Sequence, residues 1–307
     1  MKKKCITLFV FLFFLYLIRF PKEALSASRT GLMLWFQTML PTLLPFMIAA
    51  NLMIQLNLME GLTSFLSPIL RPIFRISKNG CFALLMGFVC GYPMGAKVCG
   101  DLVRQKRISK EEGQYLLNFC NHASPAYMIG YVLSDSLSLT GSLFPFLLCI
   151  YIPPLLFGII SRYLCFPKEF KEGEPGPAKQ AGLPFFMNSV EASMSNGFLN
   201  ITKLGGYMIL FSIISSMFTI FPLSSFCKDL FSLLMEITNG TAAMATHKDY
   251  FPLTVLLILS GNAFGGFSCM AQTKSMIGGT NLSFLPYICS KGVIAILTGV
   301  FTFLLLF

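Results

Sequence analysis

Long apolar runs alternate with short polar connections along almost the entire chain. A helix that crosses a membrane needs about 20 predominantly apolar residues, so runs near that length predict a bundle of membrane helices. The apolar runs cover residues 5–20, 31–56, 81–100, 114–133, 142–166, 197–221, 251–275 and 282–307. The stretch 230–244 lies between the runs 197–221 and 251–275. It mixes apolar residues with the polar sequence EITNG, and we interpret it as a broken region.

The first apolar run, 5–20, allows two interpretations. It follows the basic sequence MKKK and precedes small residues in ALSAS, which is the pattern of a cleaved signal peptide. A retained membrane span has the same apolar character, so the sequence leaves both interpretations open.

A polar linker at 167–182, rich in Pro, Gly, Lys and Glu, interrupts the apolar pattern and divides the chain into halves. We therefore expect four parts. They are an N-terminal span with an external loop (1–29), a first repeat (30–166), a cytoplasmic linker (167–183) and a second repeat (184–307).

Composition agrees with a membrane protein. Hydrophobic residues make up 55% of the chain and charged residues only 12%, against about a quarter in soluble domains. The net charge of +10 comes from Lys and Arg in the connections, which favours a membrane topology signal over nucleic-acid binding. The ten cysteines are scattered without a C-x-x-C pair, so we expect small buried side chains and not a disulfide framework.

Two apolar runs carry clusters of glycine that a simple membrane helix does not need. The first contains GYPMG and the second GNAFGGFS, and Gly91 precedes Ser109 by the same interval as Gly265 precedes Ser283. Glycine-interrupted segments at corresponding positions of two halves point to a transporter binding site. We expect both to be re-entrant hairpins, although kinked spanning helices packed through glycine faces are the alternative.

The charge pattern favours the re-entrant arrangement. If the N-terminus is cytoplasmic and both segments return to the side they entered from, most of the 23 Lys and Arg residues lie on the cytoplasmic side. The two halves are then inverted relative to each other. The expected fold is an all-α polytopic membrane protein with about six full spans and two re-entrant helical hairpins in two inverted repeats.

A second kind of break is expected within the run 114–133. Ser109 and Glu112 form a capping-box pattern that starts a helix, and the polar sequence NFCNHASP follows about 15 Å deeper, near the middle of the membrane. Ser124 followed by Pro125 is typical of a helix that starts again. Such a half-helix would direct free N–H groups at an anion, whereas a proline-kinked helix with mutually satisfied polar groups is the alternative.

Charged residues within apolar membrane segments are energetically costly, so they usually indicate a functional site. Lys97, Lys203 and Lys291 outnumber Glu236, which favours an anionic substrate over a neutral nucleoside. Lys203 and Lys291 could instead extend to the membrane interface. Glu236 could hold a coupling cation or proton, or pair with one of these two lysines.

Several motifs together resemble the sporulation integral membrane protein YlbJ family, over nearly the full length from residue 30. The matching positions are Gly87, Gly91, Tyr92, Pro93, Gly95, Lys97, Asn121, Ala123, Ser124, Pro125, Glu236, Thr238, Asn239, Gly240, Gly261, Gly265, Gly266, Ser268 and Gln272. Cys90 departs from the small residue expected before GYPMG, which lowers the polarity of that hairpin tip.

This resemblance implies a gate domain of the nucleoside-recognition superfamily and a fold similar to that of concentrative nucleoside transporters. It also implies a role in spore cortex formation and in the movement of dipicolinate across the forespore envelope, in the mother-cell or outer forespore membrane. Dipicolinate is a flat aromatic dianion, so lysines and half-helix N-termini would suit its carboxylates, and Tyr92 or Phe267 could stack on its ring.

We therefore expect a carrier for a small organic anion, with no cofactor, no metal and no nucleic acid, in contact with membrane lipid. The expected substrate-binding residues are Gly91, Tyr92, Pro93, Gly95, Lys97, Asn121, Ser124, Glu236, Asn239, Gly265, Ser268, Gln272 and Lys291. A nucleoside carrier and a non-transporting assembly protein of the spore envelope are the alternatives. An enzyme is disfavoured because the two histidines lie in different halves and no H-E-x-x-H or G-x-S-x-G motif occurs. A homo-oligomer and a coupling cation or proton stay open.

Overall fold

The computed structural model describes residues 2–166, 168–170, 173 and 183–307, so most of the predicted linker lies outside the described residues. The described chain is helical and contains no strand. The α-helices are α1 (Lys2–Arg19), α2 (Pro21–Leu34), α3 (Leu40–Gln55), α4 (Met59–Thr63), α5 (Ser67–Phe74), α6 (Lys78–Cys90), α7 (Met94–Arg104), α8 (Lys110–Cys120), α9 (Phe144–Leu164), α10 (Leu183–Met217), α11 (Ser225–Met235), α12 (Ile237–Met244), α13 (Phe251–Phe264), α14 (Gly266–Met276) and α15 (Phe284–Leu306). Two π-helical segments, η1 (Trp35–Met39) and η2 (Tyr127–Ser136), and two 3-10 turns, η3 (Phe218–Ile220) and η4 (Lys248–Tyr250), complete the chain.

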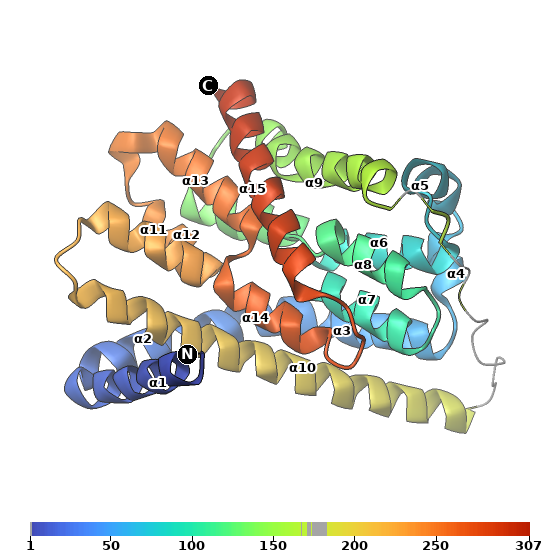
Figure 1. Ribbon diagram of the computed structural model, residues 1–307, viewed down its shortest axis with the longest axis horizontal. Coiled ribbons are helices and arrows are strands. Elements are labelled where there is room, and N and C mark those ends of the chain that lie inside the picture. The colour runs from blue at the N-terminus through green and yellow to red at the C-terminus, as the bar shows by residue number, and fades with distance from the viewer. Residues whose placement is uncertain (1, 167, 171–172, 174–182) are drawn as a thin grey trace.

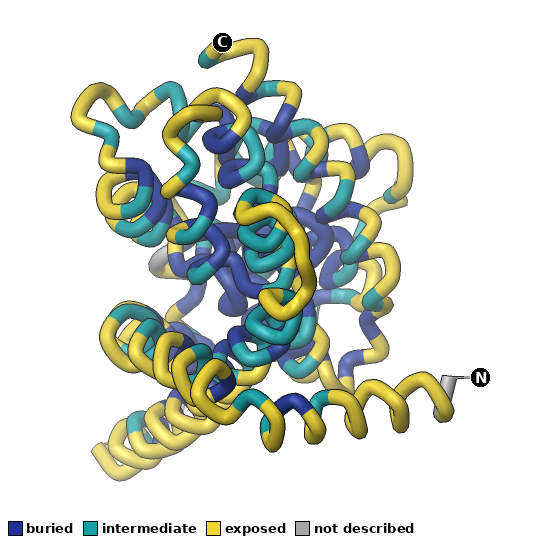
Figure 2. Tube along the Cα trace, turned by 90° about the vertical axis from the view of Figure 1, so that its left-hand side faces the viewer, coloured by how far each residue is buried: buried dark blue, intermediate teal, exposed yellow. Residues whose placement is uncertain are grey.

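Within the described residues, five helical segments are long and apolar enough to cross a membrane: Pro21–Gln55, Phe144–Leu164, Leu183–Ile220, Lys248–Met276 and Phe284–Leu306. A bent pair, Ser67–Phe74 and Lys78–Cys90, joined at 97°, could make a sixth. This confirms an all-helical membrane protein. The predicted first run forms α1, which is exposed along most of its length (Figure 2) and is not among these candidate spans.

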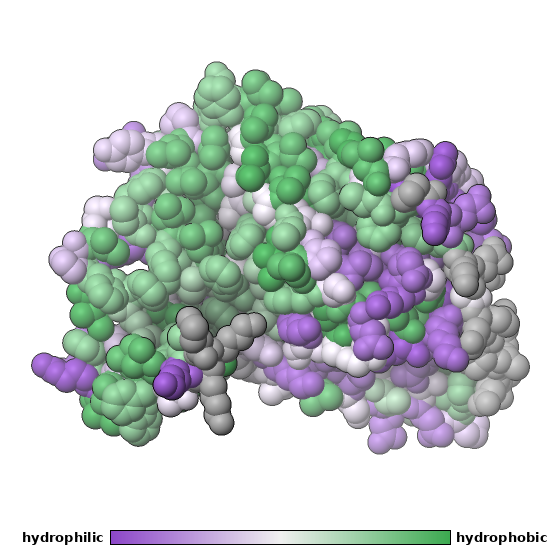
Figure 3. Space-filling view, in the orientation of Figure 1, coloured by the Kyte–Doolittle hydropathy of each residue, from purple (hydrophilic) through white to green (hydrophobic). Residues whose placement is uncertain are grey.

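The helices form an elongated bundle with the breaks near its middle (Figure 1). Helices α6, α7 and α8 lie together at one end, and the α11–α12 pair lies at the other. Hydrophilic residues gather at the α6–α8 end, whereas the rest of the visible surface is mostly apolar (Figure 3). That hydrophilic end carries the basic connector after α7, which is the side predicted to be cytoplasmic.

The first expected hairpin is present. Helices α6 and α7 pack against each other and are joined by the turn 91–93. Gly91 adopts a φ of 79°, a conformation that favours glycine, and its missing side chain makes room for Ser124. Ser77 begins α6 by accepting a hydrogen bond from the N–H of Gly80 at 3.0 Å.

The second hairpin is not where the sequence predicted it. Helices α13 and α14 form one continuous candidate span through Gly265 and do not fold back on each other. Instead α11 and α12 form the pair of packed antiparallel helices, with Glu236 at the tip. The EITNG region makes the turn because Glu236 is extended and its carboxylate caps α12, while Gly240 lets the two legs touch at Leu233.

The glycines of the α13–α14 segment have a different role from the one predicted. Gly261 packs against the side chain of Leu233 in the α11–α12 hairpin, and Gly265 packs against the ring of Tyr92 in the α6–α7 hairpin. Gly265 has a φ of 93°, so it still interrupts the helix locally. The motif therefore marks a break within a span that both hairpins approach.

The break after α8 is confirmed. Ser109 accepts a hydrogen bond from the N–H of Glu112 at 3.1 Å, as the capping pattern predicts. The Glu112 side chain instead turns to Ser77, whose N–H donates to it at 2.6 Å, and so ties α8 to the start of α6. The chain is non-helical from 121 to 124, and the helix restarts with Ser124 accepting a hydrogen bond from the N–H of Tyr127 at 3.3 Å.

A pair of alanine substitutions tests the α11–α12 hairpin. A Cβ at position 240 would overlap the backbone of Leu233, whereas a Cβ at Gly206 on α10 meets nothing within 4 Å. Overpacking costs about 1–3 kcal/mol, and replacing a helical glycine by alanine otherwise stabilises by up to about 1 kcal/mol. Gly240→Ala should lower the melting temperature in detergent and Gly206→Ala should not. Equal melting temperatures for the two variants would contradict the hairpin.

Candidate functional site: a cavity between the helix breaks

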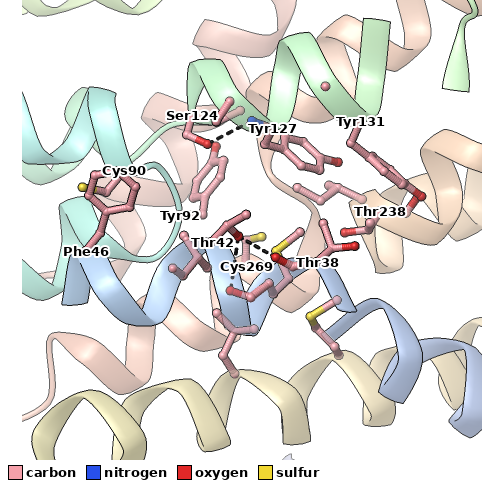
Figure 4. Close-up of a pocket in the computed structure, with 18 of the residues that line it drawn as sticks. Thr38, Thr42, Phe46, Cys90, Tyr92, Ser124, Tyr127, Tyr131, Thr238 and Cys269 are labelled. Carbon is pink, nitrogen blue, oxygen red and sulfur yellow. Dashed lines mark hydrogen bonds between the residues drawn. The ribbon is translucent and has the colours of Figure 1, made fainter. Parts of the chain in front are cut away.

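A cavity of about 520 Å³ lies where the hairpin tips meet the broken helix. Among the predicted site residues, four line it: Tyr92 from the α6–α7 tip, Ser124 from the break after α8, Glu236 from the α11–α12 tip and Gln272 from α14. The cavity therefore draws on both halves of the chain. Figure 4 shows Tyr92 and Ser124 beside Tyr127, with Tyr131 and Thr238 across from them.

Aromatic and hydroxyl side chains that the sequence analysis did not single out form much of the lining. Tyr127 and Tyr131 on η2 stack at 5.5 Å between ring centroids, and the Tyr131 hydroxyl donates to the carbonyl of Thr238 at 2.9 Å. Thr38 and Thr42 face them from η1 and α3 (Figure 4). Both pairs are spaced i, i+4, and that spacing of polar groups within an apolar run is the signal that could have found them.

Glu236 is buried at the tip of the second hairpin, and both of its carboxylate oxygens accept hydrogen bonds. The N–H of Asn239 donates to one at 2.8 Å, and the hydroxyl of Thr238 donates to the other at 3.2 Å. Asn239 does not line the cavity, because its side chain donates to Ser212 on α10 at 2.6 Å. Glu236 thus stabilises the start of α12 while it faces the cavity.

Neither lysine that the sequence offered as a partner reaches Glu236. Lys203 is exposed on α10, and the hydrogen bonds of Lys291 go to other groups. Phe267, proposed as a stacking ring, is 44% exposed and does not line the cavity. The structure therefore does not support the alternative in which Glu236 pairs with Lys203 or Lys291. Of the rings considered, Tyr92 lines the cavity together with the η2 tyrosines, and Phe267 does not.

Lys97 lies away from the cavity, in a polar cluster on the side of the α6–α7 hairpin that the charge pattern predicts to be cytoplasmic. Its ammonium donates to Asp101 and to the side chain of Asn51 on α3, each at 2.6 Å. Asp101 also pairs with Arg104, which donates to the carbonyls of Met276 and Gly278. This cluster fastens α7 to α3 and to the end of α14, and Lys97 shares the counter-ion Asp101 with Arg104.

Lys291 is fully buried on α15, directly behind the cavity wall. Its ammonium nitrogen lies 3.3 Å from the carbonyl oxygen of Asn121, 3.2 Å from Nδ1 of His122 and 4.9 Å from the ring centroid of Tyr92. No carboxylate among the described residues forms an ion pair with it. Lys291 is thus the one predicted lysine that lies next to a cavity-lining side chain.

Asn121 joins four elements at the break. Its side-chain oxygen accepts from the N–H of Ala96 on α7 at 3.1 Å, and its side-chain nitrogen donates to Thr273 on α14 and to Tyr287 on α15. Its backbone carbonyl faces Lys291. These bonds satisfy polar groups that lipid cannot satisfy.

The other predicted residues hold the cavity walls in place. Gly91 and Gly95 let the α6–α7 hairpin approach the backbone at Ser124 and Asn121. Pro93 precedes α7 and lies outside the lining, and Ser268 accepts a hydrogen bond from the Gln272 side chain at 3.1 Å. They shape the site without facing the cavity.

Comparison with known proteins gives one family model and one relative to which the chain is similar. Residues 36–161 are similar to the Gate family model, described as nucleoside recognition, and they lie in the first half of a chain with several candidate membrane spans. The chain is similar to the sporulation integral membrane protein YlbJ of Bacillus subtilis (strain 168). The two are 27% identical over 337 residues, which cover 97% of this chain and 82% of that protein. The resemblance found in the motifs is therefore confirmed. No solved structure matches.

The Lys97–Asp101 pair predicts a stability effect that is separate from ligand binding. Asp101→Asn should leave a buried ammonium without a counter-ion and destabilise the protein by about 3 kcal/mol. The control Asp249→Asn, at an exposed position on η4, should have little effect. Melting temperatures in detergent check this. The double variant Lys97→Met/Asp101→Asn should recover most of the loss, and no recovery would contradict a direct pair.

Proposed function

We propose that this protein is a membrane carrier for a small organic anion. The observation that carries the proposal is Lys291, a fully buried basic side chain beside Tyr92 with no carboxylate partner among the described residues. A buried charge without a counter-ion is costly and persists where function requires it. An anion in the cavity would supply that counter-charge across the Tyr92 ring.

The rest of the cavity suits a flat aromatic anion. The stacked Tyr127 and Tyr131 rings offer an aromatic face, and Ser124 marks the N-terminal end of a restarted helix whose free N–H groups favour negative charge. Dipicolinate combines a flat ring with two carboxylates, so we propose it as the substrate. The remaining lining is largely apolar, as is usual for a small-molecule pocket.

We further propose that the halves are inverted repeats resembling the concentrative nucleoside transporter fold. Each half would contribute one hairpin, α6–α7 or α11–α12, and one span broken at the depth of the hairpin tips. The two hairpins lie at opposite ends of the bundle in Figure 1, as inversion requires. Alternating access would then follow from movement of the hairpins and broken helices against α3, α10 and their neighbours.

The similarity to a sporulation integral membrane protein supports a role in sporulation. We place the carrier in the mother-cell or outer forespore membrane, where it would move dipicolinate during spore formation and so contribute to the spore cortex. A homo-oligomer and a coupling cation or proton are compatible with this role.

One observation favours a nucleoside as the second candidate substrate. The charged side chains that line the cavity directly are the carboxylates Glu236 and Asp135, together with the amide of Gln272. Carboxylates and amides match the hydroxyl and base N–H groups of a nucleoside. The description of the matching family model, nucleoside recognition, points the same way.

Ligand-induced stabilisation separates these possibilities. A ligand that binds only the folded state at a hundred times its dissociation constant adds about 2.7 kcal/mol of stability. Dipicolinate should raise the melting temperature of the detergent-purified protein, and uridine at the same millimolar concentration should not. A shift in melting temperature with uridine alone would indicate that the protein is a nucleoside carrier. No shift with either ligand would favour a protein that assembles the spore envelope without transporting solutes.

Substitution of Lys291 tests the residue on which the proposal depends. Lys291→Gln removes the positive charge behind Tyr92, so it should abolish dipicolinate transport into proteoliposomes while the protein stays folded and membrane-inserted. Lys203→Gln, at an exposed position on α10, is the matched control and should transport normally. Normal transport by Lys291→Gln would show that Lys291 is not part of the substrate-binding site.

A further inference from the structure

His122 and Lys291 form an isolated pair of nitrogen groups behind the cavity. Nδ1 of His122 lies 3.2 Å from the Lys291 nitrogen, and Nε2 lies 2.9 Å from the carbonyl oxygen of Ile150 on α9. Both side chains are fully buried. His122 was not among the substrate-binding residues predicted from the sequence, and it does not line the cavity.

The Ile150 carbonyl fixes which ring nitrogen of His122 carries hydrogen. A carbonyl oxygen can only accept a hydrogen bond, so Nε2 must be the protonated nitrogen that donates to it. In the neutral ring Nδ1 is then an acceptor, and the Lys291 nitrogen donates to it. The lysine end of this bond can be either an ammonium or an amine, because both carry N–H groups.

This geometry allows the pair to hold one excess proton but not two. With one proton, either the lysine is an ammonium that donates to a neutral ring, or the ring is an imidazolium that donates to an amine. With two protons, N–H groups would face each other 3.2 Å apart and two positive charges would share a buried site.

The surroundings of the pair supply no permanent negative charge. The rings of Phe88, Tyr92 and Tyr151 lie near His122, with Tyr92 from α6–α7 and Tyr151 from α9. The other titratable groups nearby, from α8, α14 and α15, are thiols and a phenol that are neutral in ordinary conditions: Cys120, Cys269 and Tyr287. The carboxylates that line the cavity, Glu236 and Asp135, form no ion pair with Lys291 or His122 among the described residues. A proton on the pair therefore has no direct counter-ion until an anion enters the cavity.

We infer that the Lys291–His122 pair is a proton-binding site that takes up one proton when an organic anion occupies the cavity. The inference rests on the proposed function and makes it more specific, since the anion and the proton would then move together. The only step is addition of a proton from water to the lysine amine, which needs no other reactant. By linkage, the anion favours the proton and the proton favours the anion.

Proton uptake on binding tests the coupling directly. Dipicolinate, a dianion at pH 8, is added to the detergent-purified protein in weak buffer with a pH-indicator dye. Wild type and the exposed-lysine control Lys203→Met should take up about one proton per dipicolinate bound. Lys291→Arg keeps a permanent charge, so it should bind dipicolinate without proton uptake. Binding by wild type without uptake would overturn the inference and leave the carrier proposal standing.

A neutral analogue provides the ligand control. Pyridine-2,6-dicarboxamide has the same ring and shape as dipicolinate but no charge. When the diamide binds, the protein should take up no proton, because a neutral ligand does not stabilise a positive charge on the Lys291–His122 pair. Equal proton uptake with the diamide and with dipicolinate would show that uptake follows conformational change and not anion charge, which would also overturn the inference.

A ligand-free measurement decides the inference if dipicolinate does not bind. The melting temperature of wild type should fall relative to that of Lys291→Met as the pH is lowered from 9 to 6, because an unfolded lysine binds a proton that the empty buried pair resists. Lys203→Met should show no such pH-dependent difference. A constant difference between wild type and Lys291→Met would mean that Lys291 stays protonated throughout and would overturn the proton site, whatever the substrate is.

Discussion

The rule that a peptide backbone inside a membrane needs hydrogen-bond partners governs the centre of this protein. Helix α8 ends in the buried interior of the bundle, where neither water nor lipid can bond to the backbone groups released. Asn121 resolves much of this problem, because it bonds to α7, α14 and α15 and presents its carbonyl to Lys291. The same residue that satisfies the break thereby positions a buried cation next to the cavity.

The cavity also depends on helices that pack unusually close to one another. Gly91 and Gly95 bring the first hairpin against the break after α8, Gly265 receives the ring of Tyr92, and Gly240 joins the legs of the second hairpin. Each glycine removes a side chain where two backbones or a backbone and a ring meet. The hairpin tips can therefore meet at one cavity from opposite ends of the bundle.

Charge is distributed unevenly around this centre. Away from the cavity, Lys97 and Arg104 are neutralised by Asp101 and by helix-end carbonyls, so they fasten helices together. Beside the cavity, Lys291 has only neutral partners. The first arrangement stabilises the fold, whereas the proposed anion and proton sites depend on the second. Lysines of similar appearance in the sequence therefore have different environments.

The sequence by itself determined the membrane class, the helices, the α6–α7 hairpin and the break at Ser124, because hydrophobic runs, glycine turns and capping residues act locally. It could not place the second hairpin, since glycines at 261 and 265 that serve close packing have the same local appearance as a turn. It placed His122 at the break but assigned it no role, and it missed the η2 tyrosines. Only tertiary structure decided that Lys291 meets His122 and Tyr92, because those contacts join residues far apart in the chain.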